Sequence, residues 1–276
     1  IFINGKRIIS NRTGFFNINR PNKCYIGKNA SDNSVAEGYI YDFRVYNRAL
    51  KNKKIRRNYK LNGVQGRDGT SKKNLKLHLL LNEGTGTTAT DKSGNSHNAS
   101  FGGAPTWLPT GGPLGGPCLD FDGTDDKLSI SSINTGSGGF EITDKMTVSV
   151  WVKSNTSEWS ASGSIVSKRY SFILHPSRTT KKISFRKYTG GSNVEGKAEF
   201  TPSEEITDWH LYTGTYDGST VKIYFDGDLK ASTSSTGTIN NDAGGPIQFA
   251  VDDFNGSRYF DGKMSNVAVW NSDQTT

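Results

Sequence analysis

The sequence predicts an all-β protein, an antiparallel β-sandwich, with one short basic helix. Three observations lead to this fold class. Short segments alternate apolar and polar residues, Gly-containing turn dipeptides separate them, and aromatic residues make up 11% of the 276 positions. That aromatic content supplies a core, which argues against a disordered chain. No apolar run approaches the ~20 residues of a membrane span, so a transmembrane helical protein is excluded.

Five segments carry the period-two pattern of half-buried strands. The clearest is residues 146–153, where Met146, Val148, Val150 and Val152 share one face. The other four are residues 183–188, 211–216, 221–225 and 266–270. The turn dipeptides are Asn4-Gly5, Asp122-Gly123, Asp217-Gly218 and Asp226-Gly227. Short strands at this spacing predict a sandwich of antiparallel sheets.

One helix is predicted, over residues 49–61, with Gly63 beyond its C-terminal end. Its apolar stripe is thin, and Lys and Arg cover the remaining surface. The stretch from 62 to 74 is polar and Gly-rich, as in a flexible linker.

The net charge of +8 hides a division along the chain. Residues 1–74 carry 17 Lys/Arg and 4 Asp/Glu, whereas the rest carries 17 and 22, so the first part is strongly basic and the second mildly acidic. The basic helix could attract an acidic glycan or a nucleic acid. No nucleic-acid-binding motif accompanies it, and charged runs usually face solvent, so a nucleic-acid partner is not expected.

An internal repeat sets the predicted domain organisation. Residues 37–47, EGYIYDFRVYN, match residues 261–271, DGKMSNVAVWN, and the Asn4-Gly5 turn matches Asp226-Gly227. We expect residues 1–61 to be the C-terminal part of one domain, 62–74 a linker, and 75–276 a second, nearly complete domain. An isolated tail of that length would leave strand edges unpaired. We therefore expect residues 1–61 to complete a sheet with missing parts of a parent chain or with a neighbouring subunit.

A series of motifs carries a resemblance to a known superfamily. In order along the second domain they are LHLLLNEGTGTTATDKSGN at 77–95, APTW at 104–107, LDFDGTDDKL at 119–128, MTVSVWV at 146–152, DWHLYTGTYD at 208–217 and IYFDG at 223–227. Together with the closing pattern GYIYDFRVYNRAL at 38–50, they resemble laminin G-like domains of the concanavalin A-like lectin/glucanase superfamily, here in tandem with the first one truncated. The resemblance implies a jelly-roll sandwich. It does not decide function, because this scaffold carries lectins, adhesion modules and glycanases.

Catalysis is not predicted. Glucanases of this fold place acids in a Glu-x-Asp-x-Glu pattern, or with one extra residue, on a concave strand, and no Glu of this chain stands in that pattern. Glu195 and Glu199 could share a strand face, but solvated loop acids are the better interpretation. The sequence therefore predicts a protein that is not an enzyme.

The resemblance also suggests a structural Ca²⁺ site, since members of the superfamily often bind calcium beside the start of the final strand. The matching positions are Asp42 and, in the second copy, Asn266. Asp91 and Asn95, in the DKSGN loop, could supply further oxygen ligands of the kind that Ca²⁺ prefers. The alternative is that this loop is an ordinary Asx turn.

Sugar binding would need exposed aromatic rings flanked by polar groups. Trp151, Trp209 and Trp270 fall in family core patterns, whereas Trp159 lies in a polar segment and is the tryptophan least explained by packing. The other candidates, expected on the strand face opposite Phe185, Leu211 and Ile223, are Arg186, Tyr188, Tyr212 and Tyr224. They form a polar-aromatic platform if that face is open, and ordinary half-buried strand residues if it is not.

Two functions compete after these exclusions. The first is a carbohydrate-binding adhesion module, with a glycan or glycoprotein as its partner, in a larger extracellular or virion-surface protein. The second is a structural or decoration component of a virus particle or extracellular fibre, whose jelly roll builds protein–protein contacts. A polysaccharide hydrolase or lyase is supported by the fold alone.

Overall fold

The computed structural model describes residues 2–3, 6–7, 73–113, 115–131, 140–159, 163–190, 194–241, 245–252 and 258–274. The chain divides into two compact units, Ile1–Thr70 and Ser71–Thr276. In the first unit, β1 (Phe2–Ile3) pairs antiparallel with β2 (Lys6–Arg7). The helix predicted over 49–61 lies outside the described residues, so it stays a prediction, as does the truncation of the first domain.

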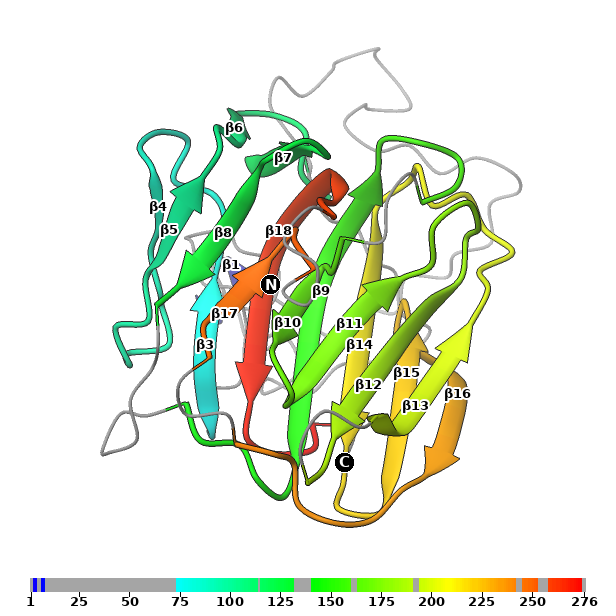
Figure 1. The fold of residues 1–276 in the computed structure, drawn as a ribbon. Coiled ribbons are helices and arrows are strands. Elements are labelled where there is room, and N and C mark those ends of the chain that lie inside the picture. The colour runs from blue at the N-terminus through cyan, green and yellow to red at the C-terminus, as the bar shows by residue number, and fades with distance from the viewer. Residues whose placement is uncertain are drawn as a thin grey trace, which may run out of the picture. The chain divides into compact units, whose positions relative to one another are not determined.

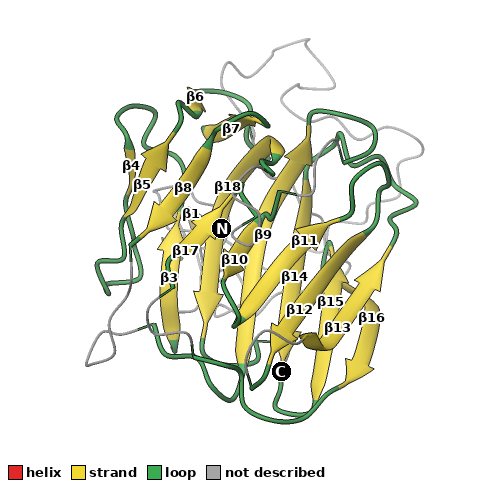
Figure 2. Ribbon diagram, viewed as in Figure 1, coloured by secondary structure: helices red, strands yellow, loops and turns green. Residues whose placement is uncertain are grey.

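The second unit is an all-β sandwich, as the sequence predicts. Its described elements are strands joined by loops (Figure 2), and each strand pairs antiparallel with its neighbours. Two sheets lie face to face (Figure 1). Among the described residues, no helix is long and apolar enough to cross a membrane.

One sheet, named here the β12 sheet, has eight strands. In spatial order they are β13 (Val194–Phe200), β12 (Ile183–Tyr188), β11 (Phe172–Pro176), β10 (Val166–Lys168), β17 (Ile247–Phe249), β8 (Lys127–Ile130), β5 (Ala99–Gly102) and β4 (Thr88–Ala89).

The second sheet, named here the β14 sheet, holds the longest strands. In spatial order they are β16 (Asp228–Ser234), β15 (Thr220–Phe225), β14 (His210–Tyr216), β9 (Met146–Ser154), β18 (Asp261–Trp270), β7 (Cys118–Asp122) and β6 (Thr106–Leu108), with β3 (Leu75–Leu79) paired to β18. All five segments predicted from alternation therefore lie in strands: β9, β12, β14, β15 and the second half of β18.

The core fills the space between the two sheets. On β9, Met146, Val148, Val150 and Val152 are buried, as their alternation predicts. The sheets approach so closely that Gly214 of β14 lies under Phe185 of β12, where an added Cβ would stand 2.3 Å from the ring. Glycine at this position is required by the packing, since any side chain would displace the ring.

The hairpin turns follow the dipeptides that predict them. Asp226 and Gly227, which connect β15 to β16, both have positive φ, at 52° and 90°. That pair of values is what a two-residue type I′ turn requires, and the right-handed twist of the strands favours this turn. The register of β14, β15 and β16, and therefore the face on which each side chain lies, is fixed by such turns.

Candidate functional site

The five residues predicted to bind sugar do not form one platform. Arg186 and Tyr188 lie on β12, in one sheet, whereas Tyr212 and Tyr224 lie on β14 and β15, in the other. Trp159 belongs to neither sheet and follows the end of β9. Each has to be considered in its own surroundings.

Trp159 is buried, with 1% of its surface exposed, so the expectation of an open loop tryptophan is corrected. Its Nε1 donates to the Lys181 carbonyl at 3.0 Å, and its ring packs edge-on against Tyr212 at a centroid distance of 6.2 Å. The indole closes the apolar core, because a large aromatic with one satisfied polar atom stabilises a core strongly. Its ring faces are not available to a sugar.

Tyr212 is also buried, at 1% exposure, and belongs to the core. Its neighbour Leu211, expected inside, is half-exposed on the outer face. Burial raises the pKa of the Tyr212 hydroxyl far above its ordinary value. The alternation predicted for β14 is therefore confirmed, but the prediction of which face of the strand enters the core is wrong.

Arg186 and Tyr188 lie in a polar environment on the β12 sheet. The Arg186 Nε donates to Ser184 Oγ at 3.0 Å. Burial, and then the positive charge of Arg186, lower the pKa of nearby His175 to about 4, so this imidazole is neutral at physiological pH. Tyr188 is 4% exposed, which leaves no open ring face for stacking.

Tyr224 is the predicted residue that does lie on an outward face. It alternates with the buried Ile223 and Phe225 on β15 and is itself half-exposed. On β9, Trp151 alternates with buried Val150 and Val152 and is half-buried, on the outward face. The sequence assigned Trp151 to the core, although the burial predicted for Val150 and Val152 already required Trp151 to face outward.

The strand register brings these two rings onto one surface. Trp151 pairs with Leu211, Ser149 with Thr213, and Thr213 with Tyr224. We call this set, Ser149, Trp151, Leu211, Thr213 and Tyr224, the Trp151 face. Two strand spacings across and two residues along place the Trp151 and Tyr224 backbones about 12 Å apart.

Hydroxyl groups fill the corner between the two rings. Ser149 Oγ and Thr213 Oγ1 are hydrogen-bonded at 3.0 Å, and both residues are half-exposed. Each hydroxyl can still accept from, or share its proton with, a ligand. At the border of the face, Lys222 donates to Asp217 Oδ2 at 2.6 Å. The Trp151 face therefore combines two flat apolar rings with short, oriented hydroxyls.

The candidate calcium ligands of the DKSGN loop bond to the protein itself. Asp91 Oδ1 accepts from the backbone N–H groups of His78 and Ser93 at 2.9 and 2.8 Å. Asp91 Oδ2 accepts from the Ser93 hydroxyl at 2.7 Å and from the His97 N–H at 2.9 Å. Four donors on two oxygens use the acceptor capacity of the carboxylate, and this is the Asx-turn alternative.

The remaining calcium candidates also take part in protein hydrogen bonds, Asn266 through its oxygen and Asn95 through its amide nitrogen. Asn266 Oδ1 lies 2.8 Å from His78 Nε2, and Asn95 Nδ2 donates to the Leu75 and Lys76 carbonyls at 3.0 Å. Asp42 lies outside the described residues. Because Ca²⁺ takes six to eight oxygen ligands, Asp91 and Asn266, whose oxygens already accept protein hydrogen bonds or lie against the His78 ring, do not fit it as arranged here. Binding itself stays a prediction to be tested.

A group of acids that the sequence reasoning passed over lies at the β7–β8 turn. Carboxylate oxygens of Asp122, Asp125 and Asp126 lie within 4.8 Å of one another. Asp126 accepts from the Ala104 and Asp122 N–H groups at 2.7 and 3.0 Å, and burial raises its pKa. These bonds tie the turn to the start of β6, and acidic groups of this kind are common without an ion.

Comparison with solved structures supports the fold. The chain resembles the binding domain of botulinum neurotoxin DC in complex with rat synaptotagmin II, with a TM-score of 0.57 and 14% identity, over 74% of this chain and 49% of that one. It also resembles a structure of botulinum neurotoxin type C, a toxin whose cell entry is described as dependent upon interaction with two ganglioside molecules. The TM-score is 0.55 and the identity 17%, over 73% of this chain and 49% of that one. The chain thus spans about half the length of these structures.

Sequence comparison identifies the superfamily. No curated protein matches the chain. Residues 122–275, more than half of the chain, match the family described as the concanavalin A-like lectin/glucanases superfamily. The matched region lies within the second unit and includes β9, β14, β15 and β18, the strands that build the Trp151 face and its supporting core. The chain belongs to the concanavalin A-like lectin/glucanases superfamily.

Proposed function

We propose that the second unit is a non-enzymatic carbohydrate-binding module and that its Trp151 face holds the glycan. The observation that carries this proposal is the outward placement of Trp151 and Tyr224 around the Ser149–Thr213 hydroxyl pair. Aromatic rings offer flat apolar surfaces with a negative face, which suits the C–H face of a pyranose. Neighbouring hydroxyls can then exchange hydrogen bonds with the sugar.

The strands make this arrangement rigid before any ligand arrives. Trp151 lies on the nine-residue strand β9, which pairs with β14 on one side and β18 on the other. Side chains on central strands lose little freedom when a ligand binds, and preorganisation of this kind favours affinity. A spacing of about 12 Å between the two backbones suits an extended oligosaccharide that contacts both rings.

Two further observations support the proposal. The superfamily includes lectins, as its name states. One solved structure similar to this chain is a botulinum neurotoxin DC binding domain in complex with SialylT, with a TM-score of 0.55 and 14% identity. In the wider proposal, the module serves adhesion to a glycan or glycoprotein, within a larger extracellular or virion-surface protein.

A glycan array with the full chain tests the proposal. We expect one or more oligosaccharides to bind, and Trp151→Ala and Tyr224→Ala each to weaken that binding about tenfold, since each removes a stacking ring. Thr106→Ala, an exposed change at the far edge of the same sheet, serves as the matched control and should leave binding intact. If both ring variants retain full binding, the Trp151 face is not the glycan site.

The structural-component alternative also has an observation in its favour. Leu211 lies on the Trp151 face, and Leu229, which pairs with Tyr224 on β16, is 53% exposed. Apolar side chains on one face of a sheet suit protein contacts as well as sugars. Sedimentation of the wild-type chain and of Leu229→Ala distinguishes the two. Concentration-dependent assembly that Leu229→Ala abolishes, together with an array without bound glycans, would favour the structural role.

A further inference from the structure

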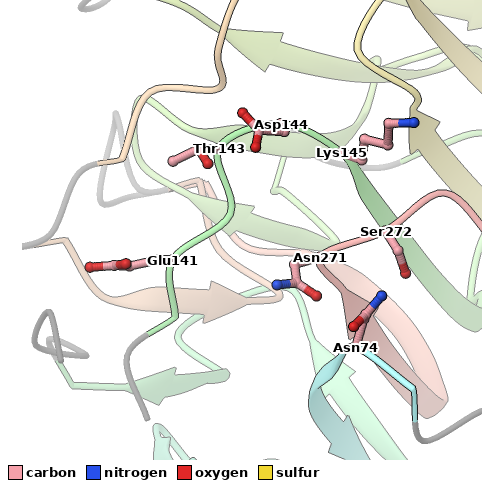
Figure 3. Close-up of a pocket in the computed structure, with 7 residues that line it drawn as sticks. All are labelled: Asn74, Glu141, Thr143, Asp144, Lys145, Asn271 and Ser272. Carbon is pink, nitrogen blue, oxygen red and sulfur yellow. The ribbon is translucent and has the colours of Figure 1, made fainter. Parts of the chain in front are cut away.

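A polar recess lies at the end of the second unit, where the chain passes into β3 and leaves β18 (Figure 3). Its volume is about 320 Å³. Figure 3 shows Asn74, Asn271 and Ser272 grouped at one wall, with the segment from Glu141 to Lys145 along the other. Every lining side chain is polar, although ligand pockets are usually mostly apolar.

Hydrogen bonds to backbone carbonyls hold the walls in place. The Asn271 N–H donates to the Asn74 carbonyl at 3.0 Å, which joins the two ends of the unit. The Thr147 hydroxyl donates to the Ser272 carbonyl at 2.8 Å, and the Ile239 N–H donates to the Thr143 carbonyl at 2.6 Å. Three segments far apart in sequence are thereby fixed around the recess before any ligand is present.

The lining offers both signs of charge and a buried acceptor. Glu141 and Asp144 supply carboxylates and Lys145 an ammonium group, and in the part of the chain that the structure describes none of the three makes an ion pair. The Asn271 Oδ1 is buried and has no hydrogen-bond partner among the described residues. A buried acceptor without a donor is costly, so a rotation of the Asn271 amide that brings this oxygen to a ligand hydroxyl or ammonium in the recess would be favoured.

We infer that this recess binds a monosaccharide-sized, polyhydroxylated ligand without an acidic group, such as a terminal hexose or hexosamine of a glycan. The volume is at the small end of ligand pockets and admits one sugar ring. All seven lining side chains carry polar groups, which suits a ligand with several donors and acceptors. Two carboxylates against one ammonium disfavour an acidic sugar and favour a neutral or protonated amino sugar.

The recess is a second site, separate from the Trp151 face. Thr147 and Thr215, which pair across β9 and β14 between the two places, are 2% and 0% exposed, so the open surface is interrupted there. The inference extends the proposed carbohydrate-binding role, but it depends on different side chains. The two can therefore fail independently.

Saturation-transfer NMR with D-galactose, D-glucosamine and N-acetylneuraminic acid as separate probes tests the inference. We expect transfer to galactose or glucosamine and not to N-acetylneuraminic acid. Asp144→Ala and Asn271→Ala should each weaken that binding about tenfold, since each removes a hydrogen bond to the ligand. Asp144 is exposed, so its variant should fold normally even if Asn271→Ala does not, and melting temperatures check both.

Several results would overturn the inference: no hexose binding, binding that both recess variants leave intact, or stronger binding of the acidic sugar. Perturbation of Glu141 and Asp144 by CaCl₂ alone, without hexose binding, would assign the recess to a cation instead. Trp151→Ala is the matched control. If it weakens oligosaccharide binding on the array and leaves hexose binding at the recess unchanged, the two sites are distinct. If no oligosaccharide binds on the array while hexoses bind at the recess, the proposed role of the Trp151 face is wrong and the inference about the recess stands.

Discussion

Trp151 and Trp159 are tryptophans only eight positions apart, but they lie in opposite environments. Trp159 is 1% exposed, packs at 6.0 Å from Phe260 and donates to the Lys181 carbonyl. Trp151 is half-exposed on the outer face of the β14 sheet. Polar neighbours in the sequence around Trp159 suggested an exposed ring, but they lie in the loop that carries the indole into the core.

Replacing each tryptophan separates stability from binding. We expect Trp159→Ala to lower the free energy of unfolding by about 3–5 kcal/mol, because it opens a large cavity in the core. Trp151→Ala should lower it by about 1 kcal/mol or less, since the ring is outside the core. Urea denaturation followed by circular dichroism measures both. Equal losses for the two variants would contradict the burial difference described here.

At the scale of elements, period-two alternation identified strands but left their phase open where both faces are apolar. On β9 the inward face is apolar from Met146 to Val152, so Val148 and Val150 predict the phase correctly. On β14, Leu211 and Tyr212 are adjacent and both could be buried. The neighbouring strands decide that Tyr212 points inward, because Trp159 and Phe225 pack against it.

Other elements gave little signal in the sequence. Strands of three residues, such as β10 and β17, are too short to show a period, and pairing with their neighbours defines them. The recess could not be predicted either, since its walls come from positions near 74, 141 and 271. Only the fold brings these segments together, whereas the Trp151 face could have been predicted from the phase of β9.

The β14–β15 hairpin contains a charge whose effect on stability depends on pH. Asp217 Oδ1 accepts from the Ser219 and Thr220 N–H groups at 2.9 and 2.8 Å, and Oδ2 accepts from Lys222 Nζ. Desolvation by itself would raise the pKa of Asp217. The hydrogen bonds, that of Lys222 foremost, outweigh it and hold the pKa well below the ordinary value. The folded state therefore favours the ionised carboxylate.

Asp217→Asn tests this contribution. We expect the variant to lose about 1–3 kcal/mol of unfolding free energy at neutral pH. The depressed pKa makes this stabilisation fully present above the unfolded value of about 3.9, and lost as pH falls below it. Urea denaturation across the acidic range should thus show the wild type and variant converging. Asp228→Asn, at an exposed position at the start of the neighbouring strand β16, is the control. A difference in unfolding free energy between the wild type and Asp217→Asn that stays constant at all pH values would argue against a contribution from the Asp217 charge.

At the scale of the whole molecule, the second unit closes on itself through protein hydrogen bonds. Asp91, His78 and Asn266 join the loop after β4 to both β3 and β18. That network occupies the place where the superfamily resemblance suggested a cation. Because the oxygens of Asp91 are already fully used, we expect any effect of millimolar calcium on the melting temperature not to depend on Asp91.

Calorimetry of the full chain measures this, with Asp91→Asn as the companion variant. The variant should lower the melting temperature equally with and without calcium, because it weakens acceptors for protein N–H groups. A calcium-dependent rise in the wild type that Asp91→Asn removes would restore the structural-calcium hypothesis. A rise that persists in Asp91→Asn would point to another site, such as the acids of the β7–β8 turn.

The separation of inward Tyr212 from outward Trp151 and Tyr224 has an evolutionary consequence. Substitutions at outward positions can change which ligand is recognised without reopening the core, and substitutions inside can be repacked without altering the surface. Descendants of one ancestor could thus diverge in specificity while keeping the same backbone.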